Sequence, residues 1–140
     1  MTDFHFTKVT VSDLDEIIEI LQDISVYKPS QSDRSKLIKN FLSQSGVFAV
    51  VAKSDTNVIG FGVLLIETKI RGGKAGHIED IVVHERWRSR GIGQQIIQEL
   101  RNLARSQGCY KMSLQCTKAN VEFYNKIGFH ESGITMQIII

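Results

Sequence analysis

The stretch RWRSRGIGQQIIQEL, residues 86–100, joins a basic loop to the start of an amphipathic helix. Arginine occupies positions 86, 88 and 90, glycine occupies 91 and 93, and apolar residues then recur at helical spacing. A helix N-terminus presents unpaired N–H groups and the positive end of the helix dipole, which favour phosphate. Glycine leaves room for the backbone to approach such an anion. The stretch therefore predicts a phosphate cradle opening a long helix that ends before Gly108.

The segments on either side predict strands and helices that alternate along the chain. Residues 4–9 alternate like a short strand, and Ser12 is expected to cap a helix with Ile17 and Ile18 on its apolar face. A hairpin with a four-residue turn, SDTN at 54–57, joins two β-rich runs. We expect strands at 4–9, 47–53, 58–67, 76–83, 110–116 and 134–140, with helices from Ser12, from Ser32 or Asp33, from Gly91 and over 119–128. The order β-α-α-β-β-β-α-β-α-β predicts an α/β fold, a mixed sheet with helices on its faces.

Composition limits the classes of function. The 140 residues suit a single domain, 1–140, and a net charge of +2 is too small for bulk attraction to nucleic acid or membrane. The cysteines, Cys109 and Cys116, form no disulfide framework and are expected in the core. The N-terminus lacks an apolar signal region, and no apolar run approaches the ~20 residues that span a bilayer. We therefore expect a soluble, cytoplasmic protein.

Several familiar motifs fail against this sequence. A dinucleotide-binding fingerprint needs a third glycine where Ile96 stands, and a P-loop ending at Lys74 needs glycine in place of Thr68. The zinc-protease pattern needs a second histidine where Arg88 stands, so no metal site is expected. One alternative remains open for the loop itself: its glycines make only a tight turn, and its arginines form a solvated rim.

Residues 88–93, RSRGIG, match the R/Q-x-x-G-x-G/A signature, and the chain resembles the GNAT N-acetyltransferases. Four segments in order are similar to the glucosamine-6-phosphate N-acetyltransferases of that superfamily: GHIEDIVV at 76–83, the signature, GCYK at 108–111 and NVEFYNKIGF at 120–129. The resemblance implies a GNAT-like acyl-CoA N-acyltransferase fold. It also implies acetyl transfer from acetyl-CoA to the amine of glucosamine 6-phosphate. The alternative acceptor is another small amine, such as an amino acid or polyamine.

The same resemblance implies how the chain would hold acetyl-CoA. The backbone of Ile81, Val82 and Val83 would pair with the pantetheine arm like an added strand, and Asn120 would anchor that arm. Tyr124 would protonate the departing thiolate, although its spacing alone is typical of a core aromatic. The pyrophosphate would lie against the loop formed by Arg88, Ser89, Arg90, Gly91, Ile92, Gly93 and Gln94.

For the acceptor, the resemblance places Glu79 and Asp80 in the amino-sugar site. Adjacent strand residues face opposite ways, so these two carboxylates are expected to act differently, with His77 as a structural neighbour. Gln115 stands where the family has aspartate, and an amide accepts no proton. The general base therefore remains open between a carboxylate of HIED, a backbone carbonyl and water.

The expected ligands of the substrate phosphate differ from those of the family. Isoleucines end the chain where the family has a basic residue, and the threonine-valine-glycine run after the first helix is absent. The candidates that remain are Ser25, Lys69, Arg71 and Lys111.

The terminal run ITMQIII, residues 134–140, predicts assembly with a second chain. An exposed apolar strand at a sheet edge invites pairing, and the resembled family forms homodimers with shared active sites. We therefore expect a homodimer. The competing reading is a non-catalytic module that binds nucleic acid through RWRSR, and the small net charge argues against it.

Overall fold

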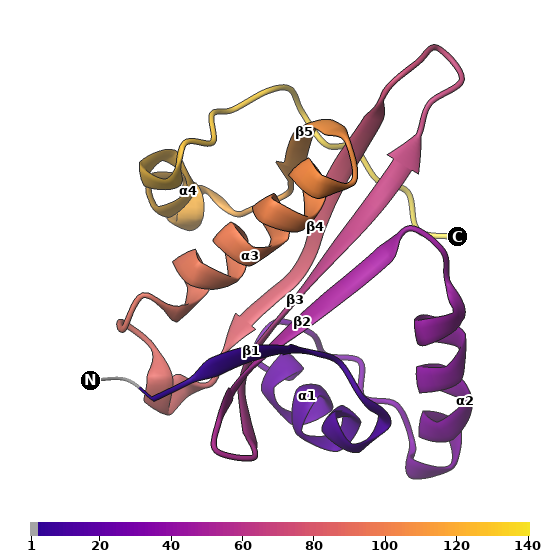
Figure 1. The fold of residues 1–140 in the computed structure, drawn as a ribbon, viewed down its shortest axis with the longest axis vertical. Coiled ribbons are helices and arrows are strands. Elements are labelled where there is room, and N and C mark those ends of the chain that lie inside the picture. Colours follow the sequence, from indigo (N-terminus) through magenta and orange to yellow (C-terminus); the bar gives the residue numbers. More distant parts are fainter. Residues whose placement is uncertain (1–2) are drawn as a thin grey trace.

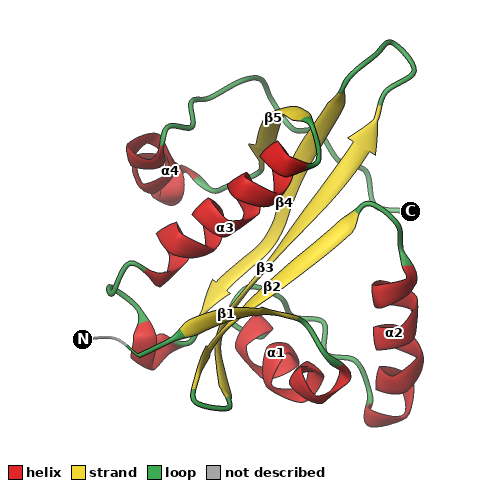
Figure 2. Cartoon of the chain, in the orientation of Figure 1, coloured by secondary structure: helices red, strands yellow, loops and turns green. Residues whose placement is uncertain are grey.

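The computed structural model describes residues 3–140 and shows one mixed sheet with helices on both faces (Figures 1 and 2). The strand order is β1-β2-β3-β4-β5; neighbours are antiparallel except for β4 and β5, which are parallel. The strands are β1 (His5–Lys8), β2 (Val47–Ser54), β3 (Asn57–Thr68), β4 (Lys74–Val83) and β5 (Cys109–Leu114). This arrangement confirms the predicted mixed α/β fold.

The helices divide between the two faces of the sheet. They are α1 (Leu14–Leu21), α2 (Gln31–Ser43), α3 (Ile92–Ser106) and α4 (Val121–Ile127), with short 3-10 turns η1 (Val11–Asp13), η2 (Glu85–Trp87) and η3 (Lys118–Asn120). The α1 and α2 helices cover one face, and α3 lies across the other (Figure 1). We call these the α1 face and the α3 face.

Helical periodicity explains why α3 packs so closely on its face. Ile92, Ile96, Ile97 and Leu100 recur at the spacing of one helix side and are almost completely buried. They contact apolar side chains from the central strands, including Leu64 and Ile78. Burial of this stripe fixes the N-terminus of α3 at the end of β4, where the basic loop connects them.

The predicted terminal strand is wrong for this chain on its own. Residues 128–140 form no helix or strand, and Ile134, Ile138 and Ile140 are 92%, 82% and 111% exposed. An apolar strand needs a neighbouring edge for its backbone hydrogen bonds and a face that covers its side chains. Within residues 3–140 this segment has neither.

Three smaller expectations also need correction. The capping box at the start of η1 is formed by Thr10 and Asp13, so Ser12 is not the cap, because η1 adds a turn before α1. The β2–β3 strands extend through Ser54 and Asn57, which leaves a two-residue turn in place of four. Cys116 is exposed rather than in the core, since it follows the end of β5.

Asp13 ties the first helix to the sheet, and its removal should destabilise the fold. The buried carboxylate pairs with Lys53 at 2.7 Å and accepts from the backbone N–H and the hydroxyl of Thr10 at 2.8 and 3.0 Å. Asp13→Ala leaves these donors unpaired and is expected to cost about 2–4 kcal/mol in urea unfolding near neutral pH. Unchanged stability would show that the pair is dispensable.

The effect of Asp13 should depend on pH. Burial acts to raise the pKa of Asp13, but hydrogen bonds from Lys53 and Thr10 outweigh it and hold the pKa below its ordinary value of 3.8. A lowered folded-state pKa gives stability that is present above the unfolded value and lost as pH falls through the folded value. The difference between wild type and Asp13→Ala should therefore persist at pH 5 and shrink below about pH 4.

Candidate active site

The parallel strands β4 and β5 separate part-way along their length. Their last paired residues are Ile78 and Leu114, whereas β4 continues to Val83 and pairs there only with β3. Beyond Ile78, one backbone edge of β4 therefore lacks a strand partner and points toward the gap that opens beside β5. The predicted cofactor residues Ile81, Val82 and Val83 lie along this edge. An extended ligand can pair with such an edge in the manner of an added strand.

A β-bulge in β4 lies at this separation. Val63 pairs with Glu79 and Phe61 with Val82, so Gly62 alone faces the two residues Asp80 and Ile81. Asp80 adopts a left-handed conformation with φ 55°. The strand alternation assumed from sequence therefore fails at Asp80, because a bulge inserts one extra residue.

Gly62 makes the bulge sterically feasible. A Cβ at this position would lie 2.6 Å from Ile96 Cγ2 and 2.8 Å from Ile81 Cδ1. Ile81 consequently packs over Gly62 toward the α3 core, whereas Glu79 shares the α1 face with Val63, its partner across the ladder. The bulge thus leaves Glu79 as the first side chain on the α1 face beyond the last β4–β5 pair.

The loop before α3 has the geometry of an anion site. Ser89 and Gly91 have φ of 64° and 80°, and left-handed residues of this kind gather successive N–H groups into a concavity. The N–H groups of Ile92, Gly93 and Gln94 precede the first intrahelical bond, which runs from Gln95 N–H to the Gly91 carbonyl at 3.1 Å. These amides and the helix dipole favour a phosphate group.

Arg88 and Arg90 of the loop do more than form a solvated rim. Arg88 donates from Nε to the Val83 carbonyl at 3.2 Å and from its guanidinium to Asp23 at 2.6 Å. Arg90 lies over the ring of Trp87, 4.8 Å from the ring centre. Arg88 therefore links the end of β4 to the residues that follow α1. The sequence does not predict the contact between Arg88 and Asp23, because no local pattern connects residues 65 positions apart.

Tyr124 lies on α4 and borders a groove of about 1030 Å³. Its ring meets Phe123 and Phe129 edge-to-face at centroid distances of 5.0 and 5.8 Å, which fixes its orientation. Burial, and then the nearby Cys116, raises the pKa of the Tyr124 phenol above its ordinary value of 10.0. The phenol therefore stays protonated at neutral pH and can donate a proton. Asn120 immediately precedes α4, and its side chain makes no capping hydrogen bond.

The groove wraps around the free edge of β5 and gathers two predicted acceptor residues, Lys111 and Gln115. His77 and Tyr124 line it as well. His77 is opposite Ser113 on β5 and opposite Leu65 on β3, and Leu65 packs on the α1 side of the sheet. His77 and Glu79 therefore share the α1 face. The sequence analysis assigns His77 only a structural role beside the two carboxylates. Its i, i+2 spacing from Glu79 could have predicted that both side chains lie on one face of the sheet.

The basic candidates for a phosphate site come together at the β3–β4 hairpin. Lys69 pairs with Glu67, and Arg71 and Lys111 lie close enough to act on the same carboxylate. Hydrogen bonding from Lys69, and then the charges of Lys69, Arg71 and Lys111, hold the pKa of Glu67 below its ordinary value. Ser25 lies elsewhere, in the loop between α1 and α2, where its hydroxyl accepts from Tyr27 N–H at 3.1 Å.

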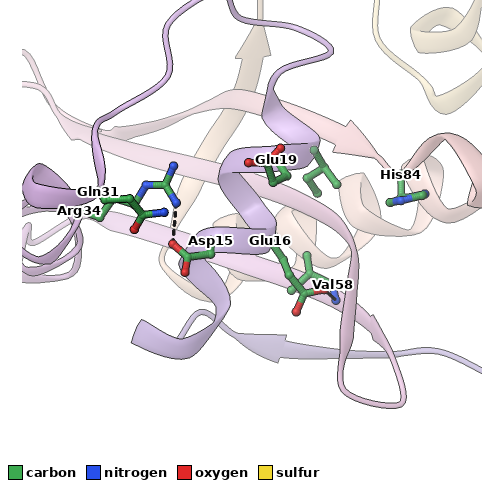
Figure 3. Close-up of a pocket in the computed structure, with 8 residues that line it drawn as sticks. Asp15, Glu16, Glu19, Gln31, Arg34, Val58 and His84 are labelled. Atoms are coloured by element: carbon green, nitrogen blue, oxygen red, sulfur yellow. Dashed lines mark hydrogen bonds and ion pairs between the residues drawn. The ribbon is translucent and has the colours of Figure 1, made fainter.

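A smaller cavity of about 360 Å³ lies between α1, α2 and the start of β3 (Figure 3). Arg34 donates to Asp15 at 2.8 Å, and Glu16 accepts from the Val58 N–H at 3.0 Å. These contacts tie α1 to α2 and to β3. We therefore assign this cavity a structural role.

Comparison with known proteins agrees with this geometry. Residues 14–129 match the family model for the acetyltransferase (GNAT) family. The chain belongs to the GNAT acetyltransferases. This confirms the fold and the activity expected from RSRGIG and its surroundings, namely an acetyl-CoA-dependent acetyltransferase.

The similar GNAT proteins span almost the whole chain. Glucosamine 6-phosphate N-acetyltransferase 1 of Dictyostelium discoideum is 34% identical over 96% of this chain and 90% of that protein. Glucosamine 6-phosphate N-acetyltransferase of Trypanosoma brucei brucei is 31% identical over 99% and 98%. The crystal structure of glucosamine-6-phosphate N-acetyltransferase from Arabidopsis thaliana matches with a TM-score of 0.91, 30% identity and 99% coverage of both chains.

Two observations indicate that acetyl-CoA fits the candidate site. Gly91 has open space within 4 Å of where a Cβ would lie, and Gly93 sits at the unpaired first turn of α3. The free edge of β4 ends beside this turn. Among residues 3–140, no group of three or more His, Cys, Asp or Glu is placed to hold a metal ion, and no helix is long and apolar enough to cross a bilayer.

The charged carboxylate of Asp80 destabilises the folded state, and substitution of Asp80 should remove this destabilisation. Burial, and then the charge of Glu79, raises the pKa of Asp80 above its ordinary value of 3.8. A raised carboxyl pKa destabilises the fold above the folded value, and this penalty vanishes below the unfolded value. Asp80→Asn should raise Tm at pH 7 by about 1–3 °C, an effect that solvent screening keeps small, and should not raise it at pH 3.

Activity should move the other way, with kcat of Asp80→Asn about 10-fold lower, because strained and desolvated groups gather at functional sites. The matched control is Asp55→Asn, since Asp55 has the same left-handed φ, 54°, in the β2–β3 turn. It should change neither Tm nor kcat. Full activity in Asp80→Asn would remove Asp80 from the site.

Proposed function

We propose that this chain transfers the acetyl group of acetyl-CoA to the 2-amine of glucosamine 6-phosphate. The observation that carries the proposal is the separation of β4 from β5, which joins three features at one place. The free edge of β4 leads to the anion-binding start of α3, Tyr124 packs against the same apolar core as Ile81 and Val83 of that edge, and Glu79 lies on the α1 face. Relatives of this name that match nearly the full chain support the choice of acceptor.

The residues divide the chemistry between the two faces. Acetyl-CoA supplies a thioester, which the amine attacks and from which the sulfur leaves as a thiolate. Ile81, Val82 and Val83 orient the arm of the cofactor, and the amides of Ser89 to Gln94 hold its pyrophosphate. Tyr124 holds the proton that the thiolate needs, and Asn120, the last residue of η3 before α4, contacts the arm.

The acceptor side is built from the α1 face. Glu79 is the carboxylate closest to the separation of the strands, and we assign it the role of taking the proton of the substrate ammonium. Asp80 orients the sugar, and Gln115 supplies hydrogen bonds without titrating. The cluster of Lys69, Arg71 and Lys111 around Glu67 supplies the positive charge that a phosphate dianion requires.

The test compares glucosamine 6-phosphate with unphosphorylated glucosamine by acetyl-CoA consumption. Wild type should prefer the phosphorylated sugar by about 100-fold or more in kcat/KM, since two or three charge-assisted contacts are at stake. Lys111→Ala should lower kcat/KM for the phosphorylated sugar only, whereas Lys39→Ala, an exposed lysine on α2, should change nothing. Equal rates for both sugars, or a reaction only with a polyamine or amino acid, would overturn this substrate.

We also propose that the active form is a homodimer in which residues 134–140 of one copy pair with the β5 edge of the other. The groove beside β5 includes the exposed Tyr110 and the partly exposed Met112 and Leu114, so it offers both a free strand edge and apolar side chains. The terminal isoleucines of the same chain are exposed and lack a strand partner within residues 3–140. Strand addition across two copies satisfies both surfaces at once.

Light scattering at micromolar concentration tests this assembly. Wild type should be a dimer, and a chain truncated after Gly133 should be monomeric and have low activity. Ile138→Lys provides a finer variant, because one charge on the apolar strand should weaken pairing while the fold of a single copy is retained. A fully active wild-type monomer would contradict the proposal.

A further inference from the structure

The proposed reaction gives no role to His77, which belongs to the segment GHIEDIVV. Its Nε2 lies 2.9 Å from Glu79 Oε1, and its Nδ1 lies 3.4 Å from the Ser113 hydroxyl. It stands one residue before the last β4–β5 pair, and Glu79 is the first residue beyond that pair. The imidazole therefore bridges β5 and the carboxylate at the separation of the strands.

The reaction requires a group that disposes of a proton. A primary amine is protonated in part at neutral pH and must become neutral before it attacks a carbonyl carbon. Gln115 follows β5 where a carboxylate would serve, and an amide cannot accept that proton. If Glu79 takes the proton, Glu79 must also lose it before the next turnover.

We propose that His77 is a proton-relay residue that orients Glu79 and carries the substrate proton from Glu79 to solvent. This proposal rests on the proposed acetyl transfer. The N–H bond of the ammonium breaks and an O–H bond forms at Glu79, after which the proton passes to His77 Nε2. The side chains of His77 and Glu79 are 40% and 50% exposed, and water can take the proton from the imidazole and restore its neutral form. The proton that reaches the thiolate comes separately from Tyr124.

The groups around His77 allow it to accept a proton and to pass it on. When Glu79 is protonated and His77 carries its own proton on Nδ1, the Ser113 hydroxyl accepts the Nδ1 N–H and Nε2 accepts the carboxyl proton of Glu79. The charged groups that share this face with His77 are Glu79, at 2.9 Å, and Lys111, two residues from Ser113 on β5. From β3, His77 meets apolar Leu65, and the nearest acid further along that strand, Glu67, is paired with Lys69.

The experiment measures kcat/KM for glucosamine 6-phosphate against pH in His77→Gln and His77→Ala. Glutamine keeps a donor toward Glu79 but accepts no proton, so both variants should lose about 10-fold near pH 7. The deficit should shrink as pH rises, because solvent then supplies the neutral amine. Added imidazole should restore part of the rate of His77→Ala, and KM for acetyl-CoA should not change.

The matched control is His5→Gln on β1, at the opposite edge of the sheet, which should behave as wild type. A deficit that is the same at every pH would show a purely structural role and overturn the relay, as would a wild-type profile in His77→Gln. If wild type acetylates another amine instead, the proposed substrate fails. The same pH-dependent loss is then expected with that amine, and its absence there would overturn the relay separately.

Discussion

Replacing Gly91 by valine should abolish useful binding of acetyl-CoA, with a loss of about 100-fold or more in affinity, since two or three charge-assisted amide contacts are at stake. The side chain would enter the open space that the loop leaves in front of the first turn of α3. Isothermal calorimetry with CoA measures the effect directly. An unchanged affinity would show that the pyrophosphate binds elsewhere.

The control for Gly91 is Gly108, because both glycines have similar left-handed φ, 80° and 83°, and open space around them. Gly108→Val should therefore carry the same backbone strain, about 1–2 kcal/mol, at the other end of α3 and leave CoA affinity intact. Gly93→Ala adds a case without strain: its Cβ would lie at an ordinary 3.6 Å from the Phe123 ring. We expect it to weaken CoA binding with little change in Tm.

Replacing Tyr124 by phenylalanine should lower kcat by about 100-fold, the usual scale for loss of a positioned general acid. The ring contacts with Phe123 and Phe129 survive this change, so Tm and the affinity for acetyl-CoA should stay close to wild type. Stopped or steady-state assays of CoA release measure the effect. Phenylalanine should also remove any fall in rate that accompanies ionisation of the phenol at high pH.

Tyr110→Phe is the matched control, since that residue is 59% exposed on β5 and its ring lies beside Lys111 rather than in the aromatic cluster. It should retain wild-type kcat. Equal kcat in Tyr124→Phe would return Tyr124 to a packing role, which is the reading that its helical spacing alone favours.

Much of the site could be predicted because its signals are local. The loop at 88–94 and the helix after it follow from glycine, arginine and apolar spacing within one short stretch, and α3 begins at Ile92 as those patterns indicate. The positions of Glu79 and Tyr124 likewise follow from short segments. Two local predictions were wrong, namely the helix cap at Ser12 and the length of the β2–β3 turn. At both places, neighbouring residues were equally suitable for the predicted role.

Contacts between residues far apart in the sequence could not be predicted in the same way. The contact of His77 with Ser113 needs the pairing of β4 with β5, and those strands are joined through α3. The contact of Arg88 with Asp23 similarly spans 65 positions. Neither the hydrophobic period of a strand nor its residue types indicate which distant strand lies next to it in the sheet.

By itself, the sequence determined which segments between residues 5 and 127 become helices and strands, and it determined the glycine-containing start of α3. These properties depend on backbone preferences and apolar periods that act over a few residues. The tertiary structure alone decided the bulge at Asp80, the parting of β4 from β5 after Ile78, and the exposure of the terminal isoleucines. Each of these depends on register and on the presence of a partner edge, and a strand acquires its register only from the chain that packs against it.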